Sequence, residues 1–104
     1  MKIVASSREF LTFISDQLDL VKNLSFKAMM GEFLLYFDGK LFGGIYDDRL
    51  LVKHTKSARA LLPDAPLQKP YPGAKEMILI ENLDDKEFLA KLIDCVCNDL
   101  PDKK

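Results

Sequence analysis

The chain has few of the residues on which metal and redox chemistry depend. Among 104 residues there are no tryptophans, one histidine and two cysteines. Cys95 and Cys97 are two positions apart on an expected helix, where side chains point about 200° apart, so they do not readily pair. One histidine and these two thiols also fall short of the four donors usual for zinc. We therefore expect reduced thiols and no metal or cofactor.

Long apolar runs and a dominant charge are also missing. Fifteen basic residues oppose 16 acidic ones, and the pI is near 5.8, so bulk charge does not attract polyanions. No segment approaches the roughly 20 apolar residues that span a bilayer. The beginning, MKIVASSRE, has too short an apolar stretch for a signal peptide. The sequence therefore predicts a cytoplasmic protein in which residues 1–104 form a single domain.

Three segments have the apolar periodicity of helices. Residues 7–21 follow Ser6-x-x-Glu9, a capping-box pattern, and carry an apolar stripe on one face. The stripe consists of Phe10, Leu11, Ile14, Leu18 and Val21, with Phe13 at its margin. A short helix over 56–62 is expected after Thr55, which is a suitable N-cap.

The last helix is expected over residues 85–99. Asp84-x-x-Glu87 precedes it in a capping pattern, and its apolar residues recur at helical spacing. Four of the five prolines lie between residues 63 and 72, which excludes this segment from the interior of a sheet. It is expected to be a long loop, with an edge strand over 67–71, and loops of this length are disproportionately functional or mobile.

Strand signals dominate the middle of the chain. Asp38-Gly39 and Asp47-Asp48 are tight-turn pairs between runs of strand-forming residues, and Asp-Gly is typical of a type I′ hairpin turn. They predict an antiparallel meander, and the apolar run EMILIE predicts a further strand. The expected strands are 27–37, 40–46, 49–54 and 76–81. Together with the helices, they predict a two-layer α+β fold with a mostly antiparallel sheet.

Two-residue turns also predict the register of the strands. Leu35 should face Phe42 across the first hairpin, and alternation then places an aromatic centre with a basic border on one sheet face. This candidate interaction face consists of Phe33, Leu35, Phe37, Lys40, Phe42, Arg49, Leu51 and Lys53. The residues provide no pattern for a catalytic, cofactor-binding or metal-binding role.

The segment MMGEFLLYFDGKLFGGIYDDRLLVK resembles the central signature of the TfoX N-terminal domain family. The matching positions are Met29 to Gly31, Tyr36, Asp38, Gly39, Lys40, Phe42, Leu50 and Lys53. Met30-Gly31-Glu32 stands where the family commonly has Phe-Gly-Gly. The resemblance implies a fold similar to secretion-chaperone-like α+β domains and brings no established catalytic residues. Full-length competence regulators have a second, C-terminal domain, so it also implies a stand-alone copy of the first.

Three functional hypotheses follow. The leading one is a non-enzymatic regulatory or protein-interaction module, with an unknown protein partner or a second copy as in a homodimer. The second is binding of single-stranded nucleic acid, as in transcription or competence regulation, because aromatic platforms with a cationic rim stack bases. The third is a small enzyme that uses His54 with a carboxylate from the proline-rich loop. No membrane partner is expected.

Overall fold

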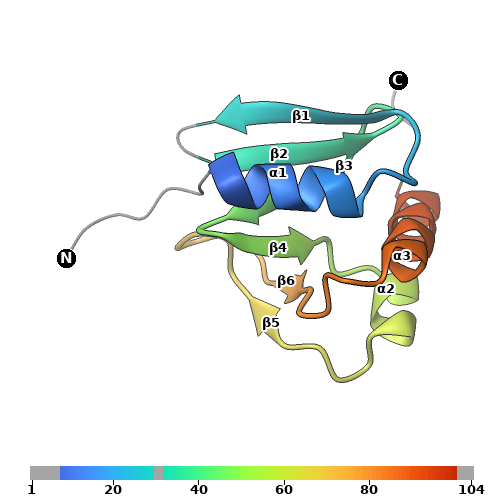
Figure 1. Cartoon of the computed structure of the whole chain (residues 1–104). Coiled ribbons are helices and arrows are strands. Elements are labelled where there is room, and N and C mark those ends of the chain that lie inside the picture. Colours follow the sequence, from blue (N-terminus) through green and yellow to red (C-terminus); the bar gives the residue numbers. More distant parts are fainter. Residues whose placement is uncertain (1–7, 30–31, 101–104) are drawn as a thin grey trace.

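A computed structural model describes residues 8–29 and 32–100 of the chain. The predicted Ser6 capping box and the Met30-Gly31 pair lie outside the described residues. The described residues form three helices and six strands (Figure 1). In order they are α1 (Arg8–Gln17), β1 (Leu24–Met29), β2 (Glu32–Phe37), β3 (Lys40–Tyr46), β4 (Arg49–Val52), α2 (Lys56–Leu61), β5 (Leu67–Gln68), β6 (Met77–Leu79) and α3 (Lys86–Asp99).

The six strands form one antiparallel sheet in the order β1-β2-β3-β4-β6-β5. The first four are a meander, since each pairs with the next along the chain. The predicted edge strand is present as the short β5, and it pairs with β6 at the far edge of the sheet. The predicted α+β fold with an antiparallel sheet is therefore confirmed.

The predicted strand over 27–37 is wrong, because two strands occupy this part of the chain. β1 pairs with β2 in antiparallel register, and Met29 lies opposite Glu32. β1 begins at Leu24, directly after Asn23, which has a positive φ of 60°. The alternation of apolar and polar residues in LSFKAM is itself a strand pattern. This alternation indicates the additional strand, whereas the turn dipeptides do not.

Both predicted hairpin turns are present. Asp38 and Gly39 have φ values of 54° and 83°, and Asp47 and Asp48 have values of 53° and 55°. Positive φ at both central residues defines a type I′ turn, whose twist matches that of the strands it joins. Asp47-Asp48 is therefore a turn, as predicted.

The register of β2 and β3 differs from the predicted one because β3 contains a bulge. Phe37 pairs with Lys40 as predicted, but Leu35 pairs with Gly43 instead of Phe42. An extra residue on one strand reverses the alternation beyond it. Ile45 therefore shares a face with Leu35, and Tyr46 moves to the opposite face.

All three helices pack against one side of the sheet, which we call the helix face. The core there joins sheet side chains to residues of α1, α2 and α3. Its sheet members are Leu35, Phe42, Ile45, Leu50, Val52 and Ile78. The helix predicted over 7–21 ends earlier, because α1 stops at Gln17 and a turn follows. The predicted stripe still faces the core: Ile14 in α1 and Leu18 in the turn are fully buried, and Phe10, Leu11 and Val21 pack around them. We call the opposite side, with Leu34, Tyr46 and Leu51, the open face.

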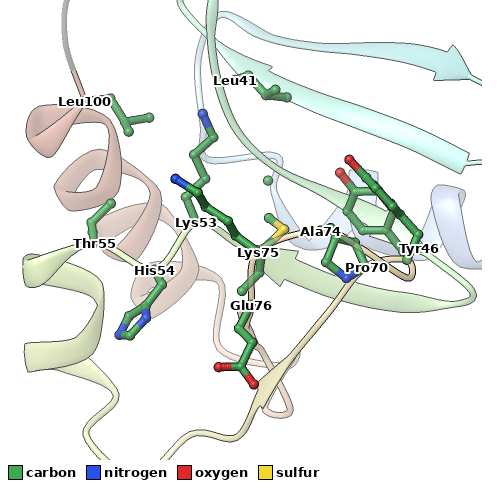
Figure 2. A pocket seen from close by; sticks show the side chains of 13 residues that line it. Leu41, Tyr46, Lys53, His54, Thr55, Pro70, Ala74, Lys75, Glu76 and Leu100 are labelled. Carbon is green, nitrogen blue, oxygen red and sulfur yellow. The ribbon is translucent and has the colours of Figure 1, made fainter.

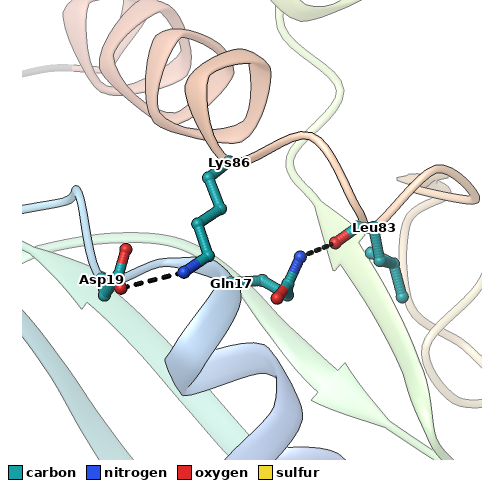
Figure 3. Close-up of polar contacts among 4 residues, drawn as sticks. All are labelled: Gln17, Asp19, Leu83 and Lys86. Atoms are coloured by element: carbon teal, nitrogen blue, oxygen red, sulfur yellow. Dashed lines mark hydrogen bonds and ion pairs between the residues drawn. The ribbon is translucent and has the colours of Figure 1, made fainter.

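Polar contacts hold α1 against the segment that leads into α3 (Figure 3). The side-chain amide of Gln17 donates to the carbonyl oxygen of Leu83 at 2.5 Å. Lys86 Nζ lies 3.0 Å from Asp19 Oδ2 in an exposed ion pair, a kind of contact that contributes only about 0–1 kcal/mol. The apolar stripe therefore supplies most of the stabilisation, and these contacts set the orientation of α1.

The caps of the later helices are partly as predicted. Thr55 Oγ1 accepts from the amide of Ala58 at 3.2 Å, which confirms the cap of α2. For α3, Asp85 caps the helix by accepting from Phe88 N at 3.0 Å, so the prediction of Asp84 was wrong by one residue. The amide of Asp84 instead donates to Asn82 Oδ1 in the preceding turn.

We expect acid to weaken the junction between α2 and α3. Asp99 accepts from the amide and the hydroxyl of Ser57 at 2.8 and 3.0 Å, and these hydrogen bonds lower the pKa of Asp99. A lowered pKa in the folded state stabilises it above the ordinary aspartate pKa of about 4, and the contribution is lost as pH falls through the lowered value. In urea unfolding, the advantage of the natural chain over Asp99→Asn should persist at neutral pH and disappear in acid. A difference that does not change with pH would contradict this assignment.

Candidate functional site

The structure divides the predicted interaction face between the two sides of the sheet. Leu35 and Phe42 are 0% exposed in the core, and Phe33 and Phe37 pack against it from the same side. Lys40 Nζ donates to the carbonyl oxygen of Cys97 at 3.1 Å, near the end of α3. These five residues thus lie beneath or beside the helices. The aromatic platform that the nucleic-acid hypothesis requires is therefore not on the surface.

The other three predicted residues lie elsewhere. Arg49 and Leu51 belong to the open face, because they pair with Tyr46 and Gly44 beyond the bulge. Arg49 donates to Tyr46 O and to the side chain of Gln68, at 3.1 and 2.6 Å, so it joins β4 to β5. Leu51 is fully buried. Lys53 follows β4 and lines a cavity.

This cavity, the open-face groove, has a volume of about 700 Å³. One wall comes from β3 and the end of β4, and the other from residues 69–76, the proline-rich connection between β5 and β6. The lining that matters most is Tyr46, Lys53, Pro70, Tyr71, Lys75 and Met77. Figure 2 shows these two walls from close by.

The floor of the groove depends on a glycine. A Cβ on Gly44 would lie 2.8 Å from ring carbons of Tyr46, so the absent side chain leaves room for this ring on the sheet. Tyr46 is 7% exposed. Burial raises its pKa, and the neighbouring Glu32 raises it further. At neutral pH the groove therefore presents an uncharged phenol that is able to donate a hydrogen bond.

Two lysine amines provide positive charge. The side chains of Lys53 and Lys75 extend toward the end of the groove near Leu41 and Leu100, whereas the carboxylate of Glu76 points away (Figure 2). In residues 8–29 and 32–100, neither amine has a hydrogen bond or ion pair. Among the described residues, the groove thus combines an apolar floor with two lysine amines that form no ion pair, which suits a ligand that has both an apolar part and a carboxylate.

Groups that could act as nucleophile and base are not assembled in the described part of the chain. His54 borders the groove but is exposed, and its ring points toward α2 (Figure 2). No hydrogen bond joins it to a carboxylate within the described residues. Burial raises the pKa of the Cys97 thiol to about 11, which keeps it protonated at neutral pH. The described residues also contain no cluster of three metal-ligating side chains.

Sequence reasoning missed the residues of the connection that lines the groove, chiefly Pro70, Tyr71 and Lys75. The length and proline content of the segment indicated a functional loop, and Tyr71 is an aromatic between two prolines. Neither signal shows which sheet face the loop covers. That depends on the pairing of β5 with β6, which brings 69–76 beside β3 and β4.

The fold and groove define a small α+β domain whose sheet has helices on one face and a loop-bordered groove on the other. The sequence model of the TfoX N-terminal domain family matches residues 16–94. The chain belongs to this family, whose members are regulatory domains. The resemblance carried by the central meander is thereby confirmed. No helix in the described ranges is long and apolar enough to cross a membrane.

A relative from Spirochaeta aurantia is described as an uncharacterized 12.7 kDa protein in the trpE 5′ region. It is 33% identical over 73 residues, which are 70% of this chain and 64% of the relative. The match therefore spans less than two thirds of the relative's length. No solved structure matches the chain.

Proposed function

We propose that the chain is a non-enzymatic, cytoplasmic regulatory domain that acts by binding another protein at the open-face groove. The observation that carries this proposal is a single cavity of about 700 Å³ that has an apolar floor and two lysine amines at one end. Tyr71 borders it with a side chain that is 56% exposed. Exposed aromatics beside a concave surface are typical anchors in protein interfaces.

The apolar and basic groups of the groove indicate which kind of segment of a partner protein would bind there. An apolar side chain would lie against Tyr46 and Met77, while a nearby carboxylate would contact Lys53 and Lys75. An acidic, partly apolar segment of a protein has both groups. Cys97 is a protonated thiol at neutral pH, and His54 has no hydrogen bond to a carboxylate among the described residues. These two observations support binding over catalysis.

Affinity capture from cells that contain the protein tests this function. We expect the captured protein, once identified and purified, to bind at least about fivefold more weakly to Tyr71→Ala, since anchor residues typically contribute more than 1 kcal/mol. The double variant Lys53→Gln with Lys75→Gln should weaken binding further and reduce its dependence on salt.

Lys91→Gln and Phe13→Ala are matched controls, because both residues are exposed on helices outside the groove. They should bind the partner as well as the natural chain does. If the groove variants and the controls bind the partner equally, the groove is not the binding site.

A further inference from the structure

The edge strand β1 lacks the features that usually prevent a strand from pairing with another chain. Five of its six residues are exposed, including Phe26 at 40% and Met29 at 45%. It pairs with β2 without a bulge, contains no proline and has one charge, Lys27. Natural edges are commonly protected by prolines, bulges, several charges or a covering segment. Among the residues that the structure describes, nothing covers the outer edge of β1, so this strand is available to add a further strand.

The hydrogen bonding of β1 identifies the groups at its free edge. The amide of Asp38 donates to the carbonyl oxygen of Asn23 at 3.0 Å, so these two residues form a hydrogen-bonded pair. In an antiparallel ladder such pairs alternate with pairs whose amides and carbonyls point away. The amides and carbonyls of Leu24, Phe26 and Ala28 therefore point outward from the sheet.

We propose that β1 is a homodimerisation strand, which pairs antiparallel with β1 of a second copy about a two-fold axis at Phe26. In this register Phe26 faces Phe26 of the second copy, and Leu24 faces its Ala28. Every outward amide and carbonyl of the three residues then has a partner. The two sheets become one continuous sheet, and the groove on β3 and β4 of each copy stays open.

The charges of β1 favour a second copy in this register. On the open face, Lys27 faces Ser25 of the second copy, so no like charges meet. A shift of the axis to Lys27 would place this lysine against itself, and like charges directly opposite are destabilising. With the axis at Phe26, all three outward residues, Leu24, Phe26 and Ala28, also have partners in the second copy. The strand is thus self-complementary, as an isologous interface requires.

Opposite charges at position 25 test the register directly. In the dimer, Ser25→Glu creates two pairs with Lys27 across the axis, whereas Ser25→Lys creates two repulsive contacts. From the usual strength of cross-strand charge pairs, the dimer dissociation constant should fall about 2- to 30-fold for Ser25→Glu and rise by a similar factor for Ser25→Lys. Sedimentation equilibrium over a range of protein concentrations measures both, and both shifts should shrink at high salt.

Ala60→Glu and Ala60→Lys are the matched controls, because Ala60 is exposed on α2, far from β1 in Figure 1. They change the net charge equally and should leave the dissociation constant unaltered. Tyr71→Ala should also leave it unaltered, which separates this proposal from the function of the groove.

A proline tests the backbone contribution. Phe26→Pro removes an outward amide that makes no bond to β2, so the monomer should keep its circular dichroism while dimerisation falls at least tenfold. Phe26→Ala retains the amide and should have a smaller effect on association. The proposal is overturned if the natural chain and Ser25→Glu both stay monomeric at millimolar concentration. It is likewise overturned if a dimer forms whose affinity is the same in all variants at positions 25 and 26.

Discussion

Replacing Phe42 by alanine should cost about 3–5 kcal/mol of unfolding free energy, as truncations of buried phenylalanines usually do. Phe42 is 0% exposed and joins β3 to the helix core. Domains of this size commonly have only about 5–15 kcal/mol of stability. We therefore expect a fall in the melting temperature of more than about 12 °C, by the usual relation for 60–100-residue domains.

Urea unfolding followed by far-UV circular dichroism measures this effect. Phe13→Ala is the matched control, since Phe13 is 39% exposed on α1 and should lose less than about 1 kcal/mol. A Phe42→Ala protein as stable as the natural chain would mean that the ring is on the surface. Such a result would also restore the aromatic face that the nucleic-acid hypothesis requires.

The second large effect is expected for Gly43→Ala. A Cβ at this position would collide with the carbonyl oxygen of Leu51 and lie 3.0 Å from Val52 Cα. Both atoms belong to the backbone of β4, so the clash is relieved only if the two strands separate. The loss should be about 3 kcal/mol, at the upper end of the range for overpacked cores.

Gly73→Ala is the control for Gly43→Ala. Gly73 has a positive φ of 88°, and no atom lies within 4 Å of its Cβ position. Its substitution adds only backbone strain, of about 1–2 kcal/mol. If both variants lose equal stability, the close approach of β3 and β4 is not the reason for glycine at position 43.

The bulge in β3 determines which side chains lie on each face of the sheet. Phe42, the extra residue between Leu41 and Gly43, faces the core on the side of Leu35, and Tyr46, beyond the bulge, turns to the open face. A regular strand would have placed Tyr46 on the same face as Phe42. The groove and the candidate partner site thus depend on one extra residue in β3.

Much of the fold could be predicted from local patterns. Type I′ turns at Asp38-Gly39 and Asp47-Asp48 are determined by residues that tolerate positive φ, and the Thr55 cap by a hydroxyl one position before a helix. The apolar stripes of α1 and α3 follow from helical spacing. The family resemblance relied on the same turn and core residues.

The errors in register and in the assignment of sheet faces have a common cause. A two-residue turn defines only the pairs beside it, and the register further along depends on contacts between strands. Nothing local at Leu35 indicates that it pairs with Gly43, since the approach of Leu51 to that glycine comes from β4. The predicted face therefore mixed buried residues such as Phe42 with open-face residues such as Arg49.

The sequence by itself determined the α+β class, both tight turns of the meander and the family, because each depends on short-range residue patterns. Only the tertiary structure decided which sheet face the helices cover, where 69–76 lies, and that β1 is an exposed edge. Those properties depend on non-local pairing. A shift of one residue reverses the face of every side chain beyond it, and no local pattern reports such a shift.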